Sequence, residues 1–132
     1  MAQRSPKHLV LILAREFASN LATPMLLTDA EGTLVFFNEA AEPIVGGTFA
    51  EAGEMSFAEW SAQSAPRTAG AEPLPLDRRP AAIALFERRA AHERFVFTGL
   101  DGVEREISET ALPLFAHADE FVGVVAIFWP IG

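Results

Sequence analysis

The chain contains no cysteine and no tyrosine among its 132 residues. Without cysteine it can form neither disulfide bonds nor zinc–thiolate sites, and it has no thiol nucleophile. The absence of thiols fits a reducing compartment, and we expect a cytoplasmic protein. Its aromatic character comes from 11 phenylalanines, which pack without a polar group.

Basic residues are scarce, since ten Lys and Arg stand against 18 Asp and Glu and give a formal net charge of −8. An acidic surface repels phosphate groups, so we expect neither nucleic acid nor a membrane as partner. Long apolar runs are also missing. The run Leu9–Ala14 ends at Arg15 after six residues, which is too short for a membrane span and unlike a signal peptide.

Common catalytic motifs are absent as well. No serine lies in a Gly-x-Ser-x-Gly turn, and no glycine-rich phosphate loop is present. Three carboxylates, Glu104, Glu106 and Glu109, lie on one predicted strand, where we expect them to face solvent. Burial of one of them in a cleft beside another polar group would favour an alternative function, a small open-barrel isomerase with a carboxylate base. We therefore predict a protein that is not an enzyme.

The prediction of the fold starts from one stretch of sequence, a hairpin followed by the start of a helix. Met25–Thr28 and Leu34–Phe37 have the apolar and aromatic character of strands, and Asp29–Gly32 between them has turn chemistry. Asn38 stands where a helix N-cap belongs. We expect its side chain to accept from the backbone N–H of one of the two alanines that follow Glu39.

Capping, turn and periodicity signals place the other elements. They predict a helix over 5–20, a helical turn from Ser56, a mobile loop over 62–75, a helix over 78–91 capped by Asp77, and strands over 94–98, 103–115 and 121–129. The length indicates one domain, residues 21–132, preceded by the helix within residues 1–20. The order predicts an α+β fold with a five-stranded antiparallel sheet, helices on one face and the N-terminal helix packed outside.

The hairpin, the aromatic Phe37, Asn38, the alanine pair and Gly46 together resemble the opening of a PAS domain. The resemblance extends in order over residues 21–129. It implies a stand-alone sensory and interaction module of signal transduction. The family usually ends in Asp-Ile-Thr, whereas this sequence has Trp129-Pro130-Ile131-Gly132 there.

The resemblance also implies a small cavity, which is faced by the residue that precedes Asn38 in the sequence. The expected lining residues are Phe37, Ala41, Ile83, Phe86 and Phe128, with Arg89 at the mouth. The cavity is either filled by side chains or holds a small apolar ligand. We expect no cofactor: flavin adducts of light-sensing members need the missing cysteine. An alternative is a haem-binding sensor in which His92 is the axial ligand. We expect His8 and His117 to be surface residues.

The apolar residues of the predicted N-terminal helix cover more of its surface than a single stripe. The last strand is apolar on both faces. One sheet covers one side of a helix, so a second covering surface is needed. We expect a homodimer, and other signalling proteins are further possible partners. The residues expected at the interface are Leu9, Leu13, Phe17, Val125, Ile127 and Trp129.

Overall fold

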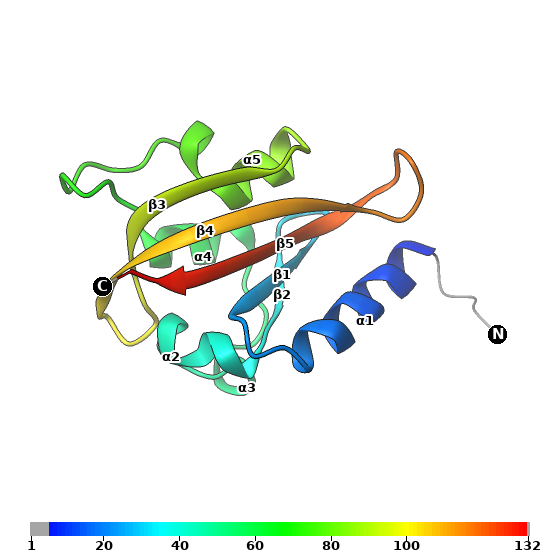
Figure 1. Cartoon of the computed structure of the whole chain (residues 1–132), viewed down its shortest axis with the longest axis horizontal. Coiled ribbons are helices and arrows are strands. Elements are labelled where there is room, and N and C mark those ends of the chain that lie inside the picture. The colour runs from blue at the N-terminus through cyan, green and yellow to red at the C-terminus, as the bar shows by residue number, and fades with distance from the viewer. Residues whose placement is uncertain (1–5, 132) are drawn as a thin grey trace.

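The computed structural model describes residues 6–131, with side chains from Leu9 onward, so the first residue of the helix predicted over 5–20 and the side chain of His8 lie outside the described residues. Five antiparallel strands form one sheet in the order β2-β1-β5-β4-β3 (Figure 1). The strands are β1 Met25–Asp29, β2 Leu34–Phe37, β3 Ala91–Thr98, β4 Glu104–Phe115 and β5 Phe121–Pro130.

The α-helices lie on both faces of this sheet. They are α1 Pro6–Ser19, α2 Glu42–Val45, α3 Phe49–Ala52, α4 Phe57–Ser64 and α5 Pro80–Phe86. Helices α4 and α5 pack on one face, here called the inner face, and α1 packs on the opposite, outer face against β1 and β5 (Figure 1). The predicted α+β architecture is confirmed. None of the helices described is long and apolar enough to cross a membrane.

Strand alternation decides which side chains reach each face. In β5, Val124, Ala126 and Phe128 belong to the inner core, whereas Val125 and Ile127 pack beneath α1. The sheet is therefore buried on its inner face and half covered on its outer face.

Asn38 caps the helical turn that follows β2, as predicted. Its Oδ1 accepts from the backbone N–H of Ala41 at 3.1 Å and of Met25 at 3.0 Å. Its Nδ2 donates to the carbonyl oxygens of Ala18, at 3.0 Å, and Thr23, at 2.8 Å. The cap is confirmed, and the same side chain also holds the end of α1 against the start of β1.

The helix predicted over 78–91 is shorter than expected. It runs over Pro80–Phe86, and Arg79 precedes it without a side-chain cap, so the expected cap at Asp77 is wrong. Proline disfavours the helical conformation in the residue before it, which sets the start at Pro80. After the helix, Arg88 adopts a left-handed φ of 56°, and β3 begins at Ala91 in register with β4.

The segment predicted as a mobile loop is held to the sheet. The backbones of Arg67 and Val96 exchange hydrogen bonds of 2.8 and 2.9 Å, and Leu74 is fully buried in the inner core. Before it, the predicted capping box of Ser56 and Glu59 is present and starts a helix of eight residues, longer than the single turn expected. One buried leucine and one backbone bridge are enough to order a polar, alanine-rich segment.

Candidate ligand site

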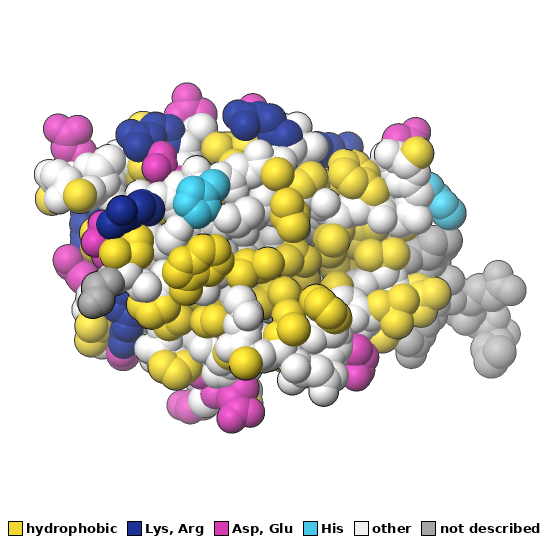
Figure 2. Space-filling model, in the orientation of Figure 1, with side chains coloured by type: hydrophobic (Ala, Val, Ile, Leu, Met, Phe, Trp, Pro, Cys, Tyr) yellow, Lys and Arg dark blue, Asp and Glu magenta, His cyan; other side chains and the backbone are white. Residues whose placement is uncertain are grey.

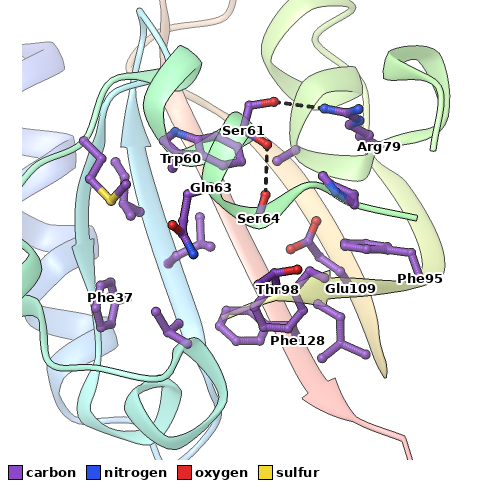
Figure 3. A pocket seen from close by; sticks show the side chains of 18 of the residues that line it. Phe37, Trp60, Ser61, Gln63, Ser64, Arg79, Phe95, Thr98, Glu109 and Phe128 are labelled. Atoms are coloured by element: carbon purple, nitrogen blue, oxygen red, sulfur yellow. Dashed lines mark hydrogen bonds between the residues drawn. The ribbon is translucent and has the colours of Figure 1, made fainter. Parts of the chain in front are cut away.

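A cavity of about 110 Å³ lies between the inner face of the sheet and helices α4 and α5 (Figure 3). Its walls are mainly apolar and include six aromatic side chains: Phe37, Phe57, Trp60, Phe95, Phe97 and Phe128. An apolar cavity of roughly 150 Å³ holds one benzene molecule, so this space suits a single small ring.

Contacts with neighbouring residues hold several of the aromatic side chains in place. Trp60 of α4 donates its Nε1–H to the carbonyl of Gly32 at 2.8 Å, and its ring meets Phe57 edge to face at 5.1 Å between centroids. Phe37 is held in the same way by Phe49, at 5.4 Å. These anchored rings oppose collapse of the walls into the space.

Glu109 of β4 points into this cavity (Figure 3) and is only 6% exposed. Burial raises the pKa of its carboxyl to about 7, and the backbone N–H of Ala81 offsets part of that rise. No salt bridge to Glu109 occurs within the described part of the chain. The cavity therefore contains a carboxyl group without a charged partner.

The expectation that all three carboxylates of this strand face solvent is wrong for Glu109. Glu104 is exposed and pairs with Arg67 at 2.8 Å, and Glu106 lies 4.0 Å from Arg94. Glu109 lies on the other face of β4, which α5 covers. Glu109 is therefore buried because it lies on the face of β4 that the helix covers.

Several other polar groups at the cavity are hydrogen-bonded to the protein. The Nε of Arg79 donates to the carbonyl of Leu74 and its Nη1 donates to Oγ of Ser61, both at 2.9 Å. The hydroxyl of Ser64 donates to the carbonyl of Ser61 at 3.4 Å. The carboxyl of Glu109, by contrast, makes no hydrogen bond to another side chain among the described residues, so it has free acceptor positions.

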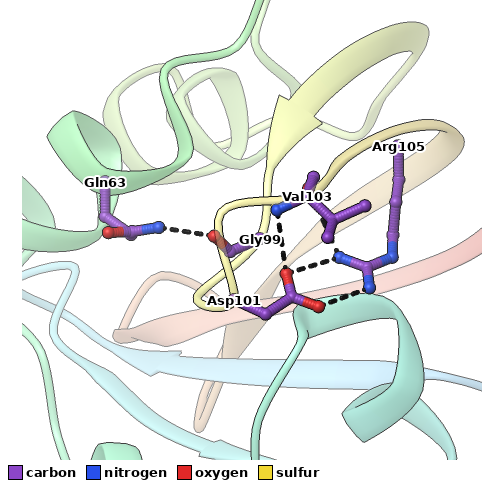
Figure 4. A network of polar contacts seen from close by, with 5 residues as sticks. All are labelled: Gln63, Gly99, Asp101, Val103 and Arg105. Atoms are coloured by element: carbon purple, nitrogen blue, oxygen red, sulfur yellow. Dashed lines mark hydrogen bonds and ion pairs between the residues drawn. The ribbon is translucent and has the colours of Figure 1, made fainter.

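Gln63 connects α4 to the β3–β4 turn (Figure 4). Its Nε2 donates to the carbonyl of Gly99 at 2.8 Å. In this turn Arg105 pairs with Asp101 at 2.7 Å, and that bond together with the N–H of Val103 lowers the pKa of Asp101 to about 2. Gln63 of the helix and Leu100 of the turn both line the cavity.

Among the expected lining residues, Phe37 and Phe128 line the cavity. Ala41 and Ile83 are buried but contribute to the packed core beside it rather than to its walls. Sequence reasoning did not assign Glu109 and Trp60 to the lining.

Phe86 and Arg89 do not line the cavity, contrary to the expectation, although Phe86 packs against the lining residue Phe57. Phe86 is 59% exposed, and Arg89 is exposed and pairs with Glu87 at 3.0 Å. The reason is the early end of α5 at Phe86, because the expectation placed both residues on a continuing helix.

His92 lies on the outer face, where it joins two residues of β4. Its Nδ1 is 2.7 Å from Oγ1 of Thr110 and its Nε2 is 3.0 Å from Oγ of Ser108. The ring is on the opposite side of the sheet from the cavity, so it cannot ligate a group bound there. Within residues 6–131, no cluster of three or more His, Asp or Glu side chains has a metal-binding arrangement.

The outer face carries the residues expected at an interface. Leu9, Leu13 and Phe17 on α1 are 50%, 59% and 62% exposed, and Trp129 on β5 is 44% exposed. Val125 is buried under α1, and Ile127 is partly covered there.

Comparison with known proteins gives structural similarity only. No protein-family model matches the chain, and no curated protein is significantly similar in sequence. The PAS domain of Bordetella pertussis BvgS has a TM-score of 0.61 at 17% identity, covering 93% of this chain and 87% of that one. The PAS domain of nitrogen regulation protein NR(II) from Vibrio parahaemolyticus has a TM-score of 0.61 at 18% identity, covering 90% and 98%.

A LOV protein of Rhodobacter sphaeroides has a TM-score of 0.68 at 14% identity, covering 92% of this chain and 67% of that one. These similarities agree with the sheet order β2-β1-β5-β4-β3 and with the helices that cross its inner face. The chain has the PAS fold.

Proposed function

We propose that this chain is a sensory module of signal transduction that binds a small, largely apolar ligand in its cavity and acts through protein–protein contacts. The observation that carries the proposal is the cavity of about 110 Å³ with aromatic walls. The similarity to the PAS domain of a nitrogen regulation protein supports a regulatory role.

A short segment connects the cavity to the outer face, which supports transmission between them. Phe37 lines the cavity, and the next residue, Asn38, bonds to the last turn of α1 through the carbonyl of Ala18. A shift of this hairpin on ligand binding would therefore reach α1 directly.

Ligand binding can be tested through Trp60, which lines the cavity. The chain has two tryptophans, so Trp129→Phe leaves Trp60 as the single fluorophore. We expect toluene to change the Trp60 emission with saturation and to raise the melting temperature. At tenfold excess over Kd, binding to the folded state alone adds about 1.4 kcal/mol.

The control is Ala82→Leu, which adds a larger side chain at a lining position. We expect it to abolish both toluene effects while the circular dichroism spectrum stays folded. Toluene near its solubility limit that changes neither signal in the Trp129→Phe protein would contradict the proposed ligand site.

The proposed protein–protein contact is a homodimer through the outer face. Figure 2 shows hydrophobic side chains gathered over β4 and β5 and beside α1. Exposed members of this area include Leu13, Phe17, Leu112 and Trp129. A second copy suits this surface, because two acidic chains with a net charge of −8 each can associate best through an area that carries little charge.

We expect a dimer by light scattering at micromolar concentration, and a monomer after the double substitution Leu13→Glu and Phe17→Glu. Both side chains are more than half exposed, so the monomer should keep its fold. Glu16→Gln, on an exposed position of the same helix, is the matched control and should leave the dimer intact. A monomeric unsubstituted protein would refute this contact.

Glu109 supports a second candidate function, proton transfer by a buried carboxylate. Its pKa of about 7 in an apolar cavity is what a general base requires. The nearby donors of Arg79 and Gln63 are already bonded to carbonyl and hydroxyl oxygens of the protein, so they do not converge on a substrate oxyanion. This arrangement favours ligand binding over catalysis.

A further inference from the structure

We propose that the cavity selects a small aromatic amine, bound as its cation, and that the carboxylate of Glu109 is the anchor that holds the ammonium group. This inference rests on the proposed function, since it requires that the cavity binds a ligand. It adds the chemical class of that ligand and the residue that recognises it.

The first reason is free acceptor capacity. An ionised carboxylate has two oxygens with about four acceptor positions. Glu109 is 6% exposed, and within the described residues only the backbone N–H of Ala81 approaches it closely enough to affect its pKa. A bound group with several N–H donors would satisfy the remaining positions, and an ammonium group has three.

The second reason is the chemistry of the walls. The faces of aromatic rings carry partial negative charge and attract cations, and they also pack against an aromatic ligand. Phe95 and Phe128 lie beside Glu109 in the cavity (Figure 3). The volume of about 110 Å³ limits the ligand to one ring with a short substituent.

The third reason is the balance of charge around Glu109. On β3, Glu93 lies directly opposite in the sheet, but Arg78 neutralises it at 2.8 Å. From the segment before α5, Arg79 lines the cavity as a cation, but its Nε and Nη1 donate to oxygens of Leu74 and Ser61, and no salt bridge joins it to Glu109 among the described residues. Helix α4 contributes only uncharged lining residues, and β5 contributes Phe128. An anionic ligand would lie near the Glu109 carboxylate, whereas a cation would neutralise it.

Because binding of a cation is linked to loss of a proton from Glu109, the proposal predicts the direction in which the affinity changes with pH. Burial raises the pKa of Glu109 to about 7, so below neutral pH the empty cavity holds a protonated carboxyl group. A cation must then displace that proton. Its affinity should rise by up to about tenfold per pH unit as pH increases toward 7, and level off above it. A neutral acceptor ligand that uses the protonated carboxyl as donor would show the opposite trend.

The test uses benzylamine and toluene, which share the ring and differ in the amino group. Both are titrated into the Trp129→Phe protein and into Trp129→Phe with Glu109→Gln, from about pH 5.5 to about pH 7.5. We expect benzylamine to bind at least about tenfold more tightly at the higher pH. Glu109→Gln should weaken it there by roughly 10- to 100-fold, the value of a hydrogen bond to a charged group. Toluene should bind both proteins alike.

The outcomes separate the two proposals. If toluene binds but the benzylamine affinity is unchanged by Glu109→Gln, or increases as pH falls, the anchor is refuted and the ligand site stands. If neither compound binds, both proposals fail. The pH dependence is measured on the protein that keeps Glu109, so it decides the question even if Glu109→Gln does not fold.

Discussion

Replacing Glu109 by glutamine is expected to increase the free energy of unfolding above neutral pH by up to about 3 kcal/mol. The cause is the burial of an ionisable group, which raises the pKa of its carboxyl from 4.5 to about 7. Glutamine is similar in size and still offers an oxygen to the N–H of Ala81, but it carries no charge to desolvate.

The sign of the pH dependence follows from the raised pKa. Below about pH 4.5 Glu109 is protonated in both the folded and the unfolded chain, and it carries no ionisation penalty. Between about 4.5 and 7 the unfolded chain loses its proton while the folded protein keeps it, so stability falls as pH rises. Above about 7 the penalty is complete and constant.

Urea unfolding at a series of pH values measures this effect. We expect the stability difference between Glu109→Gln and the unsubstituted protein to grow across this window. Glu31→Gln, at an exposed position of the β1–β2 turn, should leave the pH profile unchanged. Parallel profiles for the Glu109→Gln and unsubstituted proteins would show that Glu109 does not titrate as a buried group.

Substitution of Asn38 by alanine is expected to cost roughly 3–5 kcal/mol, more than loss of an ordinary helix cap. Asn38 is 1% exposed, and its side chain makes four hydrogen bonds to the backbone. Alanine leaves the N–H of Met25 and the carbonyl of Thr23 without this partner, whereas the N–H of Ala41 still donates to the carbonyl of residue 38 and the carbonyl of Ala18 still accepts from Leu21. Each unsatisfied buried group costs about 1 kcal/mol or more.

Chemical denaturation of Asn38→Ala and Ser56→Ala compares the two situations. Ser56 caps α4 at an exposed position, so its loss should cost about 0.5–2 kcal/mol. An Asn38→Ala protein that loses no more stability than Ser56→Ala would mean that the three additional bonds of Asn38 contribute little.

Local signals in the sequence predicted the order of the five strands and of the helices other than α3. The Asp29–Gly32 turn, the Asn38 cap and the Ser56 capping box each depend on residues within four positions of one another. Such short-range chemistry acts in the same way in any surrounding structure. For this reason the hairpin, the helix starts at Asn38 and Ser56 and the five-stranded architecture could be predicted before the fold was known.

The length of α5 could not be read in this way. Residues 87–91 have helix-forming side chains, but pairing of β3 with β4 begins at Ala91, and these long-range backbone bonds compete with one more turn of helix. The exposure of Phe86 and Arg89 follows from that competition.

The burial of Glu109 was likewise decided by the tertiary structure. Strand alternation places Glu109 on the same face as Ile107 and Ala111, which was visible in the sequence. Alternation does not tell which face the helices will cover, or that a carboxyl group will remain among the covered residues. That depends on α5 crossing β4 and on aromatic side chains from α4, β3 and β5 surrounding a space they do not fill. A cavity is a property of packing between distant segments, so its shape and its single buried acid arise only when the chain has folded.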